Sequence, residues 1–234
     1  MALSTCTVCG RPPVDRYVVS MHGEVTCARH HAREDCALCG RPRDGGEPGW
    51  SRFTATTSRC PTCSHQAVDS QEEARRHIPA VRAEMAALGI RLDRRVRVAL
   101  VEPDLINAGG PGLCLGRTLQ RIGNPVTAVL GIEIARGLTS THFGATVAHE
   151  IGHAWLAQRG ARGLAKPLEE GLCELFSGAW LKRRGTEFAR TMRRVALENP
   201  DPVYGAGYRM VRDAVVSHGI AVVLDSVCAR SRLP

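Results

Sequence analysis

The stretch His149-Glu150-Ile151-Gly152-His153 constrains the fold of this 234-residue chain more than any other five residues. Its two histidines stand four positions apart, and residues four apart share one face of an α-helix. Both imidazoles can therefore bind one zinc ion, while Glu150 can reach a water molecule on the metal's open position. The pattern predicts a zinc metallopeptidase with His149 and His153 as ligands and Glu150 as general base.

The residues around this motif predict the helix that its geometry requires. Apolar residues recur at helical spacing between Thr141 and Arg159, namely at Val147, Ile151, Ala154 and Trp155. Ser140 or Thr141 can cap the start of this helix, and Gly160 stands where a C-terminal glycine belongs. The alternative is a buried helix whose histidines are hydrogen-bonded core residues.

A catalytic zinc needs a third protein ligand, and a second helix beginning near Pro167 is its candidate source. An apolar stripe follows at Leu168, Leu172, Leu175, Phe176 and Ala179. This layout resembles peptidases of the Glu-zincin class, whose third ligand comes from a Glu-Gly step on such a helix. The resemblance implies Glu170 as the ligand, sixteen residues past His153, with Glu169 as the runner-up. Glu174 could hold a ligand histidine by its other ring nitrogen.

Seven of the ten cysteines fall within the first 63 residues; six form three Cys-x-x-Cys pairs and Cys27 stands in a Cys-x-x-His pair, both with the spacing of metal ligands. The pairs Cys6/Cys9 and Cys36/Cys39 are each followed by Gly-Arg-Pro, at 10–12 and at 40–42. This repetition indicates a duplicated unit. We expect two structural zinc sites, because some sixty residues with few aromatics bury too little apolar surface to fold without metal. Sequential pairing, as in LIM domains, would group Cys6, Cys9, Cys27 and His30, then Cys36, Cys39, Cys60 and Cys63. Cross-braced pairing would exchange partners between these groups, and His22, His31 and His65 are substitute ligands.

Composition excludes several other classes of protein. No apolar run approaches the 18 residues of a membrane span, and the first residues lack the pattern of a secretory signal. Together with the metal-type cysteine spacing, this predicts a reducing, cytoplasmic location. Two zinc ions held by seven thiolates would reduce the formal charge from +8 to about +5. The arginines are scattered along the chain, so nucleic-acid binding is disfavoured.

The remaining chain predicts an α+β fold, with a small sheet followed by a mostly helical half. Strands are expected at 96–101 and 126–134, with a Gly-rich loop at 107–116. The strand that precedes the histidine helix is predicted to be a sheet edge that pairs with extended substrate. Helices are expected at 66–88, interrupted at Pro79, and at 186–197, 204–218 and 220–231. We expect a zinc module at 1–65, a helical connector at 66–92 and a zincin-like peptidase domain at 93–234.

Four blocks of sequence carry a resemblance to a known family. They are Gly112-Leu113-Cys114-Leu115, then His149-Glu150 with His153-Ala154-Trp155, then Glu169-Glu170-Gly171 with Cys173, and finally Pro202-Val203-Tyr204-Gly205. With the zinc module, they resemble the plant growth-restricting, ubiquitin-activated peptidases, in which a LIM domain precedes a zinc-peptidase domain. The resemblance implies catalytic zinc on His149, His153 and Glu170. Ile151 and Gly152 replace methionines of the plant proteins, and the gap between His30 and Cys36 exceeds that of LIM domains. The sequence also shows no obvious ubiquitin-interacting helix before the zinc module, so we carry over the chemistry but not ubiquitin regulation or the plant substrates.

The expected reaction is hydrolysis of peptide bonds in a protein or peptide substrate, with one catalytic and two structural zinc ions. Tyr204 is the candidate donor to the oxyanion, ahead of Tyr208 and His218. Cys114, Cys173 and Cys228 are expected to be small buried thiols. The alternative function is a non-enzymatic adaptor that binds a protein partner through its zinc module, and an intact Glu150 argues against it.

Overall fold

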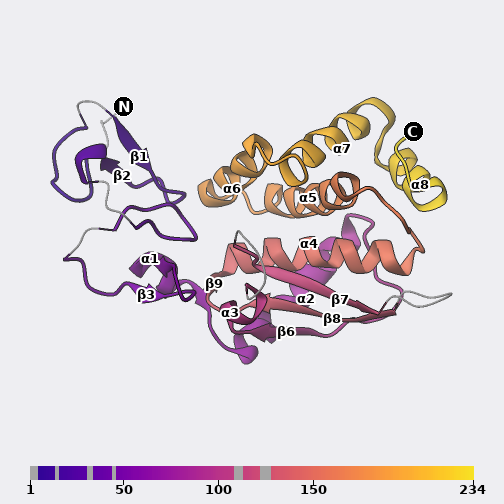
Figure 1. Ribbon diagram of the computed structural model, residues 1–234, viewed down its shortest axis with the longest axis horizontal. Coiled ribbons are helices and arrows are strands. Elements are labelled where there is room, and N and C mark those ends of the chain that lie inside the picture. The colour runs from indigo at the N-terminus through magenta and orange to yellow at the C-terminus, as the bar shows by residue number, and fades with distance from the viewer. Residues whose placement is uncertain (1–4, 14–15, 31–33, 44–45, 108–112, 122–127) are drawn as a thin grey trace.

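The computed structural model describes residues 5–13, 16–30, 34–43, 46–107, 113–121 and 128–234 (Figure 1). Helix α4 (Ser140–Gln158), which carries the two motif histidines, lies in the middle of the larger part of the molecule. A three-stranded sheet covers one side of α4, and helix α5 (Lys166–Lys182) covers the other (Figure 1). Thirteen of the nineteen residues of α4 are buried, so the motif forms part of the core.

The ends of α4 follow from local chemistry. The hydroxyl of Thr139 accepts a hydrogen bond from the backbone N–H of His142 and caps the helix, so the prediction of Ser140 or Thr141 as cap is wrong by one position. At the other end, Gly160 has φ +75°, a conformation that favours glycine over residues with a Cβ.

The sheet has the strand order β6-β8-β7. Strand β8 (Ala128–Ala135) pairs in parallel with β6 (Val98–Val101) and antiparallel with β7 (Gly116–Arg121). The prediction that the strand before the histidine helix is a sheet edge is therefore wrong, because β8 is central. Its buried, β-branched residues suit that position, whereas the more polar β7 lies at the edge. Residues 126–127 of the predicted strand, and 108–112 of the predicted loop, lie outside the described residues.

Helix α2 (Gln71–Ala87) begins later than predicted, because Ala67–Val68 form strand β5, which pairs with β9 (Leu138–Thr139). A capping box between Ser70 and Glu73 fixes its start. Pro79 does not interrupt this helix. It lies on the exposed face, where water can bond the backbone carbonyl that the ring leaves unpaired. The opposite face of α2 is buried against α4.

The remaining elements of the larger part are mostly helical, which confirms the predicted α+β class with a helical second half. They are α3 (Pro103–Ile106), α6 (Glu187–Glu198), α7 (Tyr204–His218) and α8 (Ile220–Arg230). Helix α7 packs across α5 at two glycines, Gly171 and Gly207. A Cβ at either position would collide with backbone of the facing segment, so the two helices approach as closely as they do only because both residues lack side chains.

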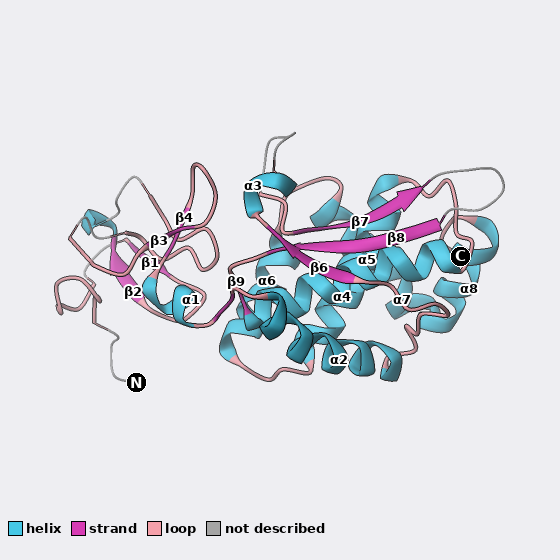
Figure 2. Cartoon of the chain, turned by 90° about the horizontal axis from the view of Figure 1, so that it is seen from below, coloured by secondary structure: helices cyan, strands magenta, loops and turns pink. Residues whose placement is uncertain are grey.

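The zinc-binding amino-terminal module lies at one end of the molecule (Figure 2). Its short elements are β1 (Tyr17–Val19), β2 (Val25–Cys27), the 3-10 turn Ala28–His30, β3 (Ser51–Arg52), β4 (Ser58–Arg59) and α1 (Pro61–His65). Arg59 ties the module to the larger part, because its guanidinium donates to both carboxylate oxygens of Asp69 at 2.9 Å and to the carbonyl of Gly137 at 2.8 Å. No described helix has the length and apolar character needed to cross a bilayer.

The close approach of α5 and α7 yields a stability prediction. Replacing Gly207 with alanine should lower the free energy of unfolding by about 1–3 kcal/mol, because the added methyl group meets the Pro167 backbone and forces the helices apart. Met210→Ala on the exposed face of α7 is the control and should have little effect. Urea denaturation followed by circular dichroism measures both, and equal midpoints for Gly207→Ala and wild type would contradict this packing argument.

Candidate metal centre and active site

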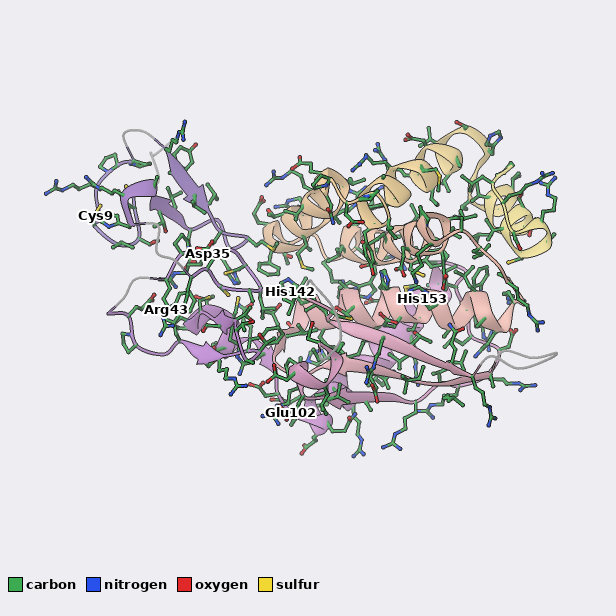
Figure 3. The ribbon with its side chains drawn as sticks, viewed as in Figure 1. Cys9, Asp35, Arg43, Glu102, His142 and His153 are labelled. Atoms are coloured by element: carbon green, nitrogen blue, oxygen red, sulfur yellow. The ribbon has the colours of Figure 1, made fainter. Side chains whose placement is uncertain are left out.

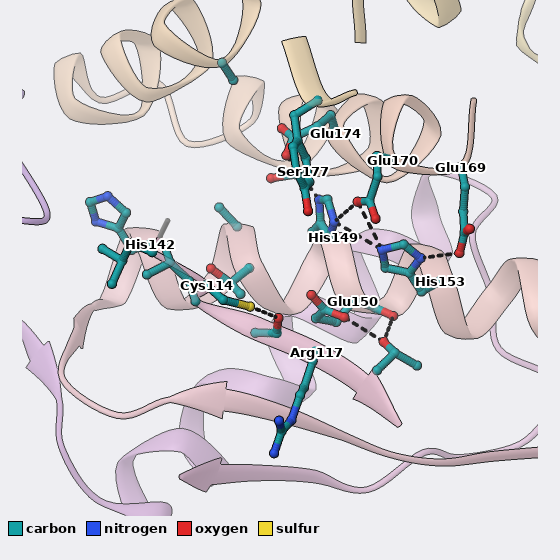
Figure 4. Close-up of a pocket in the computed structure, with 18 of the residues that line it drawn as sticks. Cys114, Arg117, His142, His149, Glu150, His153, Glu169, Glu170, Glu174 and Ser177 are labelled. Atoms are coloured by element: carbon teal, nitrogen blue, oxygen red, sulfur yellow. Dashed lines mark hydrogen bonds and ion pairs between the residues drawn. The ribbon is translucent and has the colours of Figure 1, made fainter. Parts of the chain in front are cut away.

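Three side-chain atoms from α4 and α5 converge on one point (Figure 4). The Nε2 atoms of His149 and His153 are 3.2 Å apart, and Oε2 of Glu170 lies 3.1 Å from the first and 3.4 Å from the second. A tetrahedral zinc ion with ligand distances of about 2.0–2.1 Å would hold its ligand atoms roughly 3.4 Å apart. The donor set and its spacing therefore fit one zinc ion with a free fourth position.

Each imidazole is also held from behind by a carboxylate of α5. Nδ1 of His153 lies 2.9 Å from Oε1 of Glu169, and Nδ1 of His149 lies 3.3 Å from Oε1 of Glu174. These contacts orient both Nε2 atoms toward the common point, as the partners of metal-bound histidines commonly do. Glu174 thus lies where sequence reasoning expected it, whereas Glu169, the alternative third ligand, lies on the opposite side of the ring from the metal position.

The charges of this cluster favour an ionised carboxylate. Burial acts to raise the pKa of Glu170, but hydrogen bonds from His149 and His153 and the ammonium of Lys166 outweigh it and hold the pKa below its usual range. Burial acts to lower the pKa of both histidines, yet hydrogen bonds to Glu170 and Glu174 raise that of His149, and Cys173, followed by Glu169 and Glu170, raises that of His153. A metal ion would replace the protons that these imidazoles otherwise share with the carboxylates. Lys166 Nζ lies 2.6 Å from Glu170 Oε1, which leaves the other oxygen to face the histidines.

Glu150 lies beside the edge strand rather than beside α5 (Figure 4). Its Oε2 accepts a hydrogen bond of 2.7 Å from the hydroxyl of Thr118 on β7. Gly116, also on β7, permits this proximity, since a Cβ there would lie 3.2 Å from Cγ of Glu150 and would collide with Thr146. The carboxylate of Glu150 is thus held between the histidine helix and β7, the edge strand of the sheet among the described residues.

A cavity of about 620 Å³ includes both the histidine cluster and Glu150. Tyr204, at the start of α7, lies on its wall near Lys166, and burial raises the pKa of the phenol, which keeps it a hydrogen-bond donor. The other two candidate donors are not among the lining residues. Tyr208 is buried against Gly178 between α5 and α7, and His218 is exposed at the end of α7.

The three cysteines outside the zinc module differ from one another. Cys173 is buried as expected, but its Sγ lies within 4.8 Å of a ring nitrogen of each motif histidine, a proximity that sequence reasoning missed. Its position three residues after Glu170, on the same face of α5, was the available signal. Cys114 is exposed on the cavity, contrary to expectation, and its thiol donates to the carbonyl of Gly116 at 3.0 Å. Burial raises the pKa of both thiols, so neither is a ready thiolate nucleophile.

His142 also lies on the cavity and is the histidine nearest to the zinc module on α4 (Figure 3). Burial lowers its pKa to about 4, and its Nδ1 contacts the hydroxyl of Thr139 at 2.9 Å. The imidazole is therefore neutral at physiological pH and has a structural partner. Nothing in these contacts activates a cysteine.

The two cysteine clusters of the module form separate sites with sequential grouping. The ligand atoms of each set lie within 4.8 Å of one another, first Cys6, Cys9, Cys27 and His30, then Cys36, Cys39, Cys60 and Cys63. The Sγ atoms of Cys39 and Cys60 are 3.7 Å apart, close to the roughly 3.8 Å that tetrahedral zinc–thiolate bonds of about 2.3 Å require. Both sets therefore fit structural zinc.

The two sites share one local geometry, as the repeated Gly-Arg-Pro predicts. The N–H of the first cysteine donates to an arginine carbonyl five residues on, Cys6 to Arg11 and Cys36 to Arg41, while Gly10 and Gly40 adopt positive φ. Of the substitute ligands, His22 Nε2 lies 3.3 Å from Sγ of Cys63 and supports the second site from outside. His65 belongs to neither set, and His31 lies outside the described residues.

The chain is similar to known proteins over its larger part. A sequence model of the DA1-like family (Protein DA1) matches residues 62–199, more than half of the chain. Protein DA1 of Arabidopsis thaliana is 28% identical over 137 residues, 47% of this chain and 25% of that protein. Protein DA1-related 7 of the same plant is 30% identical over 151 residues, which are 50% of this chain and 26% of that protein.

The LIM domain-containing protein HDR3 of Oryza sativa subsp. japonica is 27% identical over 163 residues, 53% of this chain and 32% of that protein. The matched segments thus span about a quarter to a third of the length of these relatives. No solved structure matches the chain significantly.

The contact between Glu169 and His153 predicts an effect on metal binding. Glu169→Ala should weaken zinc binding at the histidine cluster about tenfold to a hundredfold, because the imidazole loses the partner that orients it. Competition with a chelator, followed by metal analysis, measures the change. Glu187→Ala, which removes an exposed carboxylate of α6, is the control. An unchanged affinity in Glu169→Ala would mean that this contact has no role in holding the ligand.

Proposed function

The chain belongs to the DA1-like family, and we propose that it is a zinc-dependent endopeptidase in which His149, His153 and Glu170 hold the catalytic metal and Glu150 is the general base. The observation that carries the proposal is the position of Glu150. Its carboxylate lines the same cavity as a three-atom cluster with the spacing of zinc ligands. A purely structural zinc site would be closed, whereas this cluster opens onto a cavity.

The proposed chemistry divides between metal and protein. When bound, zinc supplies a Lewis acid that polarises a carbonyl and lowers the pKa of water. Glu150 accepts a proton as water attacks the peptide carbonyl and then delivers it to the leaving amine. The hydrogen bond from Thr118 restricts the carboxylate to the cavity wall and so fixes where this proton transfer takes place.

Strand β7 is the proposed site of substrate docking, in place of β8. Within the described residues, β7 pairs only with β8, and Gly116, Arg117, Thr118 and Gln120 line the cavity. Backbone groups on its free side can form main-chain hydrogen bonds with an extended peptide. Because Thr118 also contacts Glu150, a peptide paired with β7 would pass beside the general base. This arrangement favours an internal segment of an extended chain as substrate.

We assign Tyr204 the role of hydrogen-bond donor to the oxyanion. Its hydroxyl is on the cavity wall, it is protonated at neutral pH, and it comes from α7 rather than from the metal-binding helices. A donor from a third helix can face the metal across the substrate. The zinc module contributes no residue to the cavity lining within the described chain, and we propose that it presents a surface to a protein partner.

The substitution Glu150→Gln tests the proposed base. It should leave zinc bound at all three sites and reduce cleavage of a quenched fluorescent peptide library by about a hundredfold or more, because glutamine cannot accept the proton. Glu102→Gln, which changes an exposed carboxylate beside α3, is the control and should cleave as wild type does. Undiminished cleavage by Glu150→Gln would exclude this residue as the base, and an inactive wild type with full zinc would favour the adaptor function.

A further inference from the structure

A second cavity, of about 500 Å³, lies against the opposite side of the histidine helix. Ile151 is one of its lining residues and stands two positions from each motif histidine, about 200° around the helix. The second half of α2 and the segment at 90–95 form the other walls. Met85, Ile90 and Ile151 are buried and give the cavity an apolar floor.

Arginines surround this apolar floor without acidic partners. Arg82, Arg91 and Arg95 line the cavity, and none of them forms an ion pair with a carboxylate in the described part of the chain. Arg82 donates through Nη2 to the carbonyl of Val96, while its Nε is buried without a hydrogen-bond partner. Asp93, the acidic lining residue, lies 3.5 Å from Arg159 instead.

Arg91 and Arg95 are exposed to solvent, whereas Arg82 is half-buried beside apolar surface, where a charge without a carboxylate partner is unfavourable. Burial, and secondly the charge of Arg95, lower the pKa of Arg82, as expected for a guanidinium that has a carbonyl partner but no carboxylate beside it. A carboxylate would compensate this positive charge better than a neutral group, since it accepts two parallel hydrogen bonds from a guanidinium. An apolar chain attached to it would cover the apolar lining that is open to solvent, at Pro79, Ala83 and Leu92, above the buried floor.

We propose that this cavity binds a medium-chain fatty acid, with its carboxylate against the arginines and its chain on the apolar floor. The volume is within the range of small-molecule sites, and such sites are mostly apolar with a few placed polar groups. The ligand would touch the histidine helix from behind through Ile151. The site is independent of the proposed peptidase reaction, because none of its residues lines the metal cavity.

Calorimetric titration of the full, zinc-loaded chain with decanoate tests this proposal. One decanoate should bind per chain, and decylamine, which has the same chain length and the opposite charge, should not bind. Ala86→Trp fills the cavity from an exposed position, and Arg95→Gln removes one charge. Each should weaken decanoate binding about tenfold or more. The matched controls Ala87→Trp and Arg94→Gln change exposed neighbours that do not line the cavity, and they should bind as wild type does.

Three results would overturn the proposal. The first is a wild-type chain that binds no decanoate below its micellar concentration. The second is binding that Ala86→Trp leaves unchanged but His153→Ala abolishes, which would assign the carboxylate to the metal centre. The third is equal binding of decylamine, which would reduce the effect to nonspecific apolar contact. Unfolding temperatures of all variants, measured without ligand, distinguish loss of the site from loss of the fold.

Discussion

The close packing of α4 against α5 is the constraint on which the rest of the structure depends. Gly144 and Gly152 face Trp180 and Phe176 across this interface, where a Cβ on the glycine would lie only 2.2 Å and 2.9 Å, respectively, from the facing ring. Because these glycines lack side chains, the two helices can approach closely enough for the carboxylate of Glu170 on α5 to reach both motif histidines. The same interface buries ionisable groups. The structure tolerates their burial because each imidazole has a carboxylate at both ring nitrogens. The candidate metal site, the helix packing and the charge compensation thus all depend on the interface between α4 and α5.

The two sides of the histidine helix have different chemistry. Toward α5 the side chains are the candidate metal ligands and their carboxylate partners, whereas toward the sheet Glu150 contacts β7, which pairs on one side only within the described residues. A peptide between them would be bounded by the metal on one side and by hydrogen-bonding backbone on the other. The two cysteine clusters of the amino-terminal module contribute no residue to this cavity, and the module joins the larger part through Arg59.

Residue spacing in the sequence predicted the features that depend on local geometry, namely helices and sets of metal ligands. The motif helix, the two cysteine clusters and the helix at 204–218 follow from periodicity and ligand chemistry, whereas Glu170 was implied by the resemblance to Glu-zincin peptidases, and the structure has each of them. Errors arose where tertiary pairing decides the outcome. Nothing local to β8 specifies that it lies between two strands, and nothing local to Glu169 states that it faces Nδ1 of His153 rather than the metal. Cys114 was expected to be buried, but its exposure depends on a cavity formed by four distant segments. The roles of the site residues in catalysis stay predictions.

The most direct test of the central claim is the zinc content of the purified chain and of its His153→Ala variant. Three clusters predict three zinc ions per chain in wild type and two in His153→Ala, with the loss confined to the site between α4 and α5. Extended X-ray absorption of the wild type should then show a nitrogen- and oxygen-ligated zinc beside the thiolate-rich ones. Two zinc ions in both proteins would contradict the account, because the histidine cluster would then hold no metal.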